Sequence, residues 1–202
     1  MHKFGTDGIR SKAEDFTPDF LARIIKGLIN YAGDNIKIFL AGDTRESTEW
    51  ILQDLAIACE TFGIEYGVAG VIPTPGINYC FYEMGFDFAI DVTASHNPYV
   101  DNGIKIFERG SLSGQKLCEA GCKAIEAAIV AGKTYAPAST TDRADLHDEA
   151  VETYKKHLLD YLGTADFTGL HIGMDCANGA TLVVRAMADA KRVVQSIIHD
   201  LG

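Results

Sequence analysis

The sequence predicts an α/β fold with three layers, α/β/α, around a mixed, mostly parallel sheet, followed by the beginning of a second, similar domain. Two observations lead to this prediction. Short apolar runs that look buried on both faces alternate with longer amphipathic stretches, and a polar loop follows each apolar run. Such regular spacing is typical of βαβ units with right-handed crossovers, in which helices cover a sheet of parallel strands.

The first elements carry clear boundary signals. Thr17 followed by Pro18 is the pattern of an N-cap with proline at the first helical position, and it predicts a helix over 19–31. The apolar run at 36–41 predicts a buried strand, and the amphipathic stretch at 48–62 predicts the next helix.

The same alternation continues along the chain. We expect strands at 66–71, 86–93 and 104–107, a helix that PTPG opens and Met84 ends, a helix over about 114–131, a surface connection over 132–146 and a helix over 147–162. A strand at 170–175, a helix through Val194 and a strand at 196–199 would begin the second domain. The predicted domains are therefore 1–146, and 147–202 for a connecting helix with an incomplete second domain.

Composition narrows the class of protein. The chain has 202 residues, a net charge of −10 and no cluster of Lys and Arg, which argues against a nucleic-acid partner. It has no apolar run near the roughly 18 residues that a membrane span needs, and its first residues lack an apolar signal core. Five scattered cysteines are typical of reduced thiols. We therefore expect a cytoplasmic protein with no membrane partner.

The loop TASHNP and the return that follows it contain the groups a reaction would need. Ser95 offers a nucleophilic hydroxyl, His96 can orient or relay a proton, and Asn97 fixes a turn with the next proline. A turn at 101–103 would bring the Lys105 ammonium back beside Ser95. A polar surface turn explains the same residues, so the local pattern leaves both interpretations open.

Other polar residues follow neighbouring predicted strands. The loops GDTRES, VIPTPG and TASHNP should gather on one edge, because ligands in such sheets bind at the carboxyl ends of the strands. Arg10 offers a donor fork for a phosphate or pairs with an acid. For Asp43 and Arg45 we favour an internal salt bridge that fixes their loop.

Three further patterns receive no functional assignment. Asn178 and Gly179 stand at a predicted helix start that either takes an anion or is simply N-capped. Cys118 and Cys122 are spaced i, i+4 but lack a second pair of ligands, so packing is favoured over zinc. The histidines other than His96 are isolated, and structural or solvated roles are the default.

Several motifs taken together resemble a known family. FGTDGIR, GDTREST, GVIPTPG, TASHNPYVDNGIKIF and GMDCANGAT occur in the order and rough spacing of the α-D-phosphohexomutases, from residue 4 to about residue 180. The form SHNPYxDNGIK most resembles the phosphoglucosamine mutase branch. Phosphomannomutases and phosphoglucomutases are the alternatives, since sugar choice lies mainly in a third domain that is absent here.

The resemblance implies a reaction and a set of roles. Ser95 would be a phosphoserine that exchanges its phosphoryl group with a hexosamine phosphate through a hexose bisphosphate, converting glucosamine 6-phosphate to glucosamine 1-phosphate. Arg10, His96 and Lys105 would flank it, with Lys105 a candidate general acid or base. Thr6 and Asn97 would join Arg10 and Lys105 in binding phosphate. The implied metal is Mg²⁺, reached by Ser95 through its phosphate.

The sequence departs from the family pattern in one respect. The Asp-Gly-Asp-Gly-Asp-Arg metal loop, the sugar-recognition loop and a later phosphate loop do not occur in the 202 residues. We therefore expect this polypeptide alone, whether a fragment or a natural truncation, to be inactive as a mutase. A non-catalytic remnant is a further alternative. An incomplete second domain would expose apolar surface at Leu170, Ile172 and Met174, which favours self-association.

Overall fold

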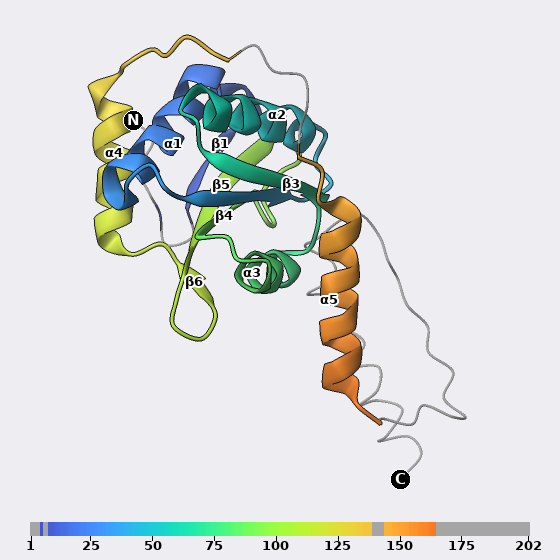
Figure 1. Cartoon of the computed structure of the whole chain (residues 1–202). Coiled ribbons are helices and arrows are strands. Elements are labelled where there is room, and N and C mark those ends of the chain that lie inside the picture. Colours follow the sequence, from blue (N-terminus) through green and yellow to red (C-terminus); the bar gives the residue numbers. More distant parts are fainter. Residues whose placement is uncertain (1–4, 6–7, 139–143, 165–202) are drawn as a thin grey trace.

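The computed structural model describes residue 5 and residues 8–138 and 144–164 (Figure 1). The predicted beginning of the second domain, with its strand, the 178–179 helix start and its apolar surface, lies outside the described residues, as does Thr6. The boundary predicted at residue 146 remains a prediction.

One mixed sheet forms the centre of the fold. Its strand order is β1-β5-β4-β2-β3, and β6 pairs with β5. The strands are β1 (Ile9–Lys12), β2 (Lys37–Gly42), β3 (Glu65–Val71), β4 (Phe88–Val92), β5 (Asp101–Arg109) and β6 (Gly114–Lys116). The mixed sheet is confirmed, but the described part is not mostly parallel. β3, β2 and β4 are parallel to one another, whereas β5 runs antiparallel to β4, β1 and β6.

Helices cover both faces of the sheet, which confirms the three-layer fold (Figure 1). They are η1 (Ala13–Asp15), α1 (Pro18–Ala32), α2 (Glu46–Thr61), α3 (Thr74–Glu83), α4 (Glu119–Ala131) and α5 (His147–Leu162). α1, α2 and α4 pack on one face, and α3 with the start of α5 packs on the other. Each face has its own apolar core, so the central strands are buried on both sides.

Local signals explain several of these boundaries. The Thr17 side chain accepts a hydrogen bond from the amide of Phe20 at 3.3 Å, which confirms the predicted N-cap of α1. Gly33 follows the helix at a φ of 91°, a backbone conformation that favours glycine. α2 begins at Glu46, slightly before the predicted start, with Arg45 in the N-cap position.

The turn predicted at 101–103 is wrong. These residues are the first part of β5, and they pair with β1, where Arg10 lies opposite Gly103. Sequence analysis missed β1 because a four-residue edge strand carries little apolar periodicity. The consequence for the site is that β1 brings Arg10 into the sheet beside β5.

The helix predicted from residue 114 is also wrong at its start. Gly114, Gln115 and Lys116 form β6 against β5, and α4 begins only at Glu119. Glu108 organises this region, since its Oε1 accepts hydrogen bonds from the Gln115 side chain at 3.1 Å and from the Cys118 amide at 3.2 Å. Gly114 is required there because a Cβ would lie 2.3 Å from Phe81.

The segment before α5 is more than a surface connection. Ala144 and Leu146 exchange backbone hydrogen bonds with Val68 on β3, at 2.7 and 2.9 Å. α5 has its predicted bounds and extends away from the sheet beyond its first turns (Figure 1). His147 and His157 have structural roles, since the former lies 2.7 Å from the carbonyl of Ala69 and the latter stacks on Tyr79.

Within the part of the chain that the structure describes, no helix is long and apolar enough to cross a membrane.

Candidate functional site: the loop after β4

Three loops meet at the carboxyl edge of the parallel strands, as the sequence predicts. The loop after β2 donates the Asp43 amide to the carbonyl of Val92 at 3.1 Å. The loop after β3 donates the Ile72 amide to the carbonyl of Gly42 at 3.2 Å. Thr74, at the start of α3, donates its hydroxyl to Asp91 of β4 at 2.7 Å. The loop after β4, residues 93–100, therefore lies among groups from three strands.

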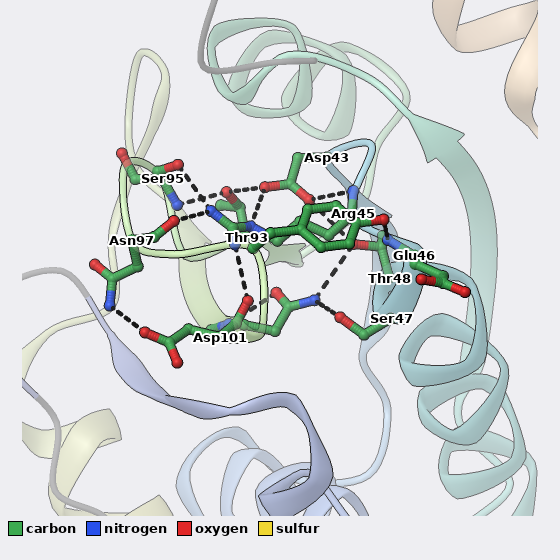
Figure 2. A network of polar contacts seen from close by, with 12 residues as sticks. Asp43, Arg45, Glu46, Ser47, Thr48, Thr93, Ser95, Asn97 and Asp101 are labelled. Carbon is green, nitrogen blue, oxygen red and sulfur yellow. Dashed lines mark hydrogen bonds and ion pairs between the residues drawn. The ribbon is translucent and has the colours of Figure 1, made fainter. Parts of the chain in front are cut away.

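Asp43 forms the centre of the polar network drawn in Figure 2. It is 4% exposed, and its Oδ2 accepts the Thr93 hydroxyl at 2.6 Å while its Oδ1 accepts the Thr48 hydroxyl at 3.1 Å. The Thr93 hydroxyl oxygen accepts the amide of Ser95 at 2.9 Å. A buried carboxylate is thus connected through one hydroxyl to the backbone of the candidate nucleophile.

Arg45 donates all five of its side-chain N–H groups, four of them to backbone carbonyls. Its Nε contacts Asp43 Oδ2 at 3.1 Å, in a pair whose side chains are 8% and 5% exposed. Its Nη atoms donate to four backbone carbonyls between 2.6 and 3.0 Å away, those of Ser95, Asn97, Pro98 and Asp101. The predicted internal salt bridge is confirmed. Since a guanidinium has five donors, Arg45 fixes the loop and has none left for a phosphate.

Ser95 occupies a strained backbone position. Its φ is 58°, the one positive value among the described residues other than glycine. This left-handed region costs an ordinary residue energy, and such strain clusters at active sites when the surroundings enforce it. Here the amide of Ser95 is held by Thr93 and its carbonyl by Arg45. Figure 2 shows Ser95 at the end of the network far from α2.

The structure brings Arg10 and Asn97 together. Arg10 Nη1 donates to Asn97 Oδ1 at 3.2 Å, and Asn97 Nδ2 donates to Asp101 Oδ2 at 3.2 Å. Arg10 is half-buried, and its bond to Asn97 places its guanidinium next to the Ser95 loop. His96, in the same loop, is exposed. An arginine and a histidine beside a loop serine give this edge donors suited to an anion.

Lys105 returns along β5, antiparallel to β4, and the expected position of its ammonium beside Ser95 stays a prediction. It lies directly opposite Asp91, and its Nζ is 3.8 Å from Asp91 Oδ2. The side chain of Lys105 is 18% exposed, whereas that of Asp91 is 1% exposed. Burial raises the pKa of Asp91 to about 6, against the opposing effects of Lys105 and the Thr74 hydroxyl.

Asn102 and Gly103, at the start of β5, support the loop from below through hydrogen bonds and close backbone packing. The fully buried Asn102 donates to Ser47 Oγ at 2.8 Å and accepts the Gly103 amide at 2.8 Å. A Cβ on Gly103 would lie 2.6 Å from the carbonyl of Thr93 and 2.9 Å from that of Ile9. Only glycine fits at this crossing of β1, β5 and the loop.

Sequence reasoning missed three residues of this site: Thr93, Asn102 and Asp91. Thr93 ends a predicted strand and Asn102 lies in a predicted turn, and nothing local reveals their long-range partners. Asp91 did carry a signal, because an acid stands in the apolar run FAIDV that the sequence predicts to be buried. A buried acid requires a partner, and that requirement points to Lys105.

The described residues do not supply a metal site of their own. No group of three or more His, Cys, Asp or Glu side chains is placed to hold an ion in the described ranges. Asp43 and Asp91, the buried acids at this edge, are already bonded to Arg45 and to Thr74. Ser95, through a phosphate, is the one implied ligand that these residues contain.

Comparison with known proteins identifies the family to which the fold belongs. Residues 1–136 match the family model for phosphoglucomutase/phosphomannomutase, alpha/beta/alpha domain I. The chain belongs to this family. The described sheet, with the Ser95 loop at its carboxyl edge, is therefore a phosphohexomutase domain I.

Curated relatives are named phosphoglucosamine mutase. That of Deinococcus radiodurans is 36% identical over 188 residues, covering 88% of this chain and 40% of the relative. That of Kineococcus radiotolerans is 34% identical over 209 residues, covering 96% and 45%. The chain thus spans less than half the length of these curated phosphohexomutases.

Solved structures have the same fold. A protein of Thermus thermophilus, provisionally classed as a phosphomannomutase, is 25% identical with a TM-score of 0.62, covering 77% of this chain and 36% of its own. The parafusin phosphoglucomutase of Paramecium is 23% identical with a TM-score of 0.57, covering 68% and 27%, and supports the fold alone.

Proposed function

We propose that this chain is the phosphoryl-carrying part of a phosphoglucosamine mutase, with Ser95 as the carrier. The observation that supports this most strongly is the fixed Ser95 loop, whose backbone is held on both sides by Thr93 and Arg45 at a strained φ of 58°. Phosphoryl transfer depends mainly on positioning and on neutralising charge, so a rigid nucleophile beside cations suits it.

The proposed step is a balanced exchange. Ser95 Oγ loses its proton and bonds to phosphorus as the bond from phosphorus to a sugar oxygen breaks, and that oxygen takes up a proton. In the conversion of glucosamine 6-phosphate, phosphorylated Ser95 first gives its phosphoryl group to O1 by the reverse of this step, and the 1,6-bisphosphate then returns its O6 phosphoryl group to Ser95, which leaves glucosamine 1-phosphate. The hexosamine phosphate and the hexose bisphosphate are therefore the proposed partners.

Cations of the described fold have separate roles in this proposal. Arg10, half-buried and bonded to Asn97 beside the loop, binds phosphate oxygens through its guanidinium fork. Lys105 moves a proton at the sugar oxygen or neutralises the transferred group, and the exposed His96 relays protons to solvent. Thr6 joins the phosphate-binding set. Arg45 acts only on the shape of the loop.

Mg²⁺ belongs to the proposal as the family's cofactor, where it would neutralise phosphate charge. Among the described residues only Ser95, through its phosphate, would contact it. The phosphoryl exchange at Ser95 is therefore described above with protein groups alone.

The test is phosphorylation of the 202-residue chain. The chain is incubated with glucosamine 1,6-bisphosphate and Mg²⁺, and its intact mass is measured. We expect one phosphoryl adduct, which Ser95→Ala abolishes and Ser111→Ala, a change at an exposed loop serine, does not. No adduct on the parent chain, or an unchanged adduct on Ser95→Ala, would refute the carrier role and favour a non-catalytic remnant.

The sugar is tested separately. The curated relatives favour glucosamine phosphate, whereas the solved structures include a phosphoglucomutase. The glucose and mannose bisphosphates are therefore compared with the glucosamine compound as donors. We expect the glucosamine compound to react fastest, and no measurable conversion of glucosamine 6-phosphate by the 202-residue chain. Robust conversion would show that these residues alone form a complete mutase site.

A further inference from the structure

Asp91 is a buried acid beneath the candidate site, and the function proposed above does not use it. It is the residue before the last of β4 and is 1% exposed. Its direct neighbour across the sheet is Lys105 of β5. Directly opposed residues of antiparallel strands place their side chains on the same face, so the carboxylate and the ammonium are close by construction of the sheet.

The carboxylate makes two contacts, a short hydrogen bond and a longer ion pair. The Thr74 hydroxyl donates to Asp91 Oδ2 at 2.7 Å, which ties the acid to the start of α3. Lys105 Nζ lies 3.8 Å from the same oxygen, beyond hydrogen-bond length. With 18% of its side chain exposed, Lys105 is attracted toward the sheet and still reaches the surface. Thr74 therefore fixes the position of the carboxylate, and the fixed carboxylate attracts the Lys105 ammonium from the neighbouring strand.

The ionised acid is costly where it stands. Burial raises the pKa of Asp91 to about 6, and the charge of Asp43 adds to the rise. An apolar residue would fill a central strand without this cost. A buried charge that opposes stability and faces a candidate catalytic lysine is typical of a functional site.

We propose that Asp91 is a positioning residue whose carboxylate, anchored by Thr74, holds the Lys105 ammonium in place for phosphoryl transfer at Ser95. This inference rests on the proposed function, because it assigns Lys105 a place in that transfer. Asp91 touches no substrate in this account. It acts through Lys105.

The proposal has a pH signature. When Asp91 takes up a proton, its attraction for Lys105 is lost, so its contribution should vanish as the pH falls through about 6. The groups that face Asp91 are Lys105 from β5, Thr74 from α3 and the charged Asp43 after β2. Protonation of the donor phosphates affects the parent and the variant alike, so the ratio of the two rates isolates Asp91.

The experiment compares Asp91→Asn with the parent in the rate of Ser95 phosphorylation by glucosamine 1,6-bisphosphate. Asparagine keeps the shape and can accept the Thr74 hydroxyl. We expect uptake about tenfold slower near neutral pH, with the difference closing toward about pH 5. Asp87→Asn, at the opposite end of the same sheet, is the matched control and should leave the rate unchanged. In a Lys105→Met background, Asp91→Asn should have no further effect.

A second readout does not depend on transfer. The side-chain nitrogen resonance of Lys105, followed by NMR, should shift as Asp91 titrates in the parent and should lose that shift in Asp91→Asn. An unchanged resonance, or additive effects of Asp91→Asn and Lys105→Met on the rate, would overturn the proposal. Absence of any adduct on the parent would instead refute the proposed function, and the resonance alone would then decide whether Asp91 holds Lys105.

Discussion

The two ends of the parallel strands each have an ion pair, but one pair is exposed and the other is buried. At the amino end, Lys37 and Glu65 form a 2.7 Å ion pair whose side chains are 49% and 63% exposed. At the carboxyl end, Arg45 and Asp43 form a 3.1 Å pair whose side chains are 8% and 5% exposed. Water screens the first pair and not the second, so distance alone misranks them. Burial decides which pair shapes the molecule.

Arg45→Met should produce the largest effect. It leaves Asp43 buried without its cation and frees three carbonyls of the loop and that of Asp101 in β5, at a cost of about 3–5 kcal/mol in the free energy of unfolding. Denaturant titration measures this cost. Arg45→Lys keeps the charge with fewer, differently placed donors and should lose less. Equal stability of Arg45→Met and the parent would mean that this buried pair does not organise the loop.

Asp91→Asn should change how stability depends on pH. Because the folded state raises the pKa of Asp91 to about 6, it binds the proton more tightly than the unfolded chain, and the free energy of unfolding falls as Asp91 ionises. Relative to the parent, the variant should gain up to about 3 kcal/mol between pH ~4 and pH ~7. Unfolding titrations at several pH values test this, and a pH-independent difference would contradict it.

Ser95→Gly and Ser95→Ala separate strain from chemistry. Both remove the hydroxyl, but only glycine adopts a positive φ without penalty. Ser95→Gly should therefore be more stable than Ser95→Ala by about 1 kcal/mol. Thermal unfolding of the pair measures the difference. If alanine were as stable as glycine, the loop would not be strained at this residue.

Lys37→Met should produce the smallest effect. The exposed pair with Glu65 contributes about 0.5 kcal/mol, and added salt should reduce the difference from the parent. Denaturant titration at low and high salt checks both statements. A loss comparable to that of Arg45→Met would remove the contrast between the two ends of the sheet.

Sequence reasoning was most accurate where structure is local. The helix that Thr17 caps and the buried strands β2, β3 and β4 follow from periodicity and capping. The start of α4 was wrong because pairing of β6 with β5, a contact that the helical pattern does not reveal, overrides that pattern. The sequence predicted the pair of Asp43 and Arg45 because the two residues are next-nearest neighbours in one loop.

The candidate site also has a part that the local sequence predicts and a part that only the folded structure reveals. The loop, its gathering at the carboxyl edge and the residues Ser95, His96 and Asn97 are contiguous or follow from strand direction. The four carbonyls held by Arg45 at 2.6–3.0 Å are at least 50 residues away from it in sequence, in the loop after β4 and at the start of β5. Only the folded sheet shows that Arg45 is fully engaged by the loop and that Arg10 lies half-buried beside Asn97.

Peptide mapping of the phosphorylated chain tests the central claim most directly, namely that the fixed loop after β4 carries the phosphoryl group on Ser95. The 202-residue chain, treated with glucosamine 1,6-bisphosphate and Mg²⁺, is digested and the modified residue is located by fragmentation. We expect the phosphoryl group on Ser95, and its loss from Arg45→Met, in which the loop is no longer held. Phosphate on Thr93 or elsewhere, or full modification of Ser95 in Arg45→Met, would contradict the account.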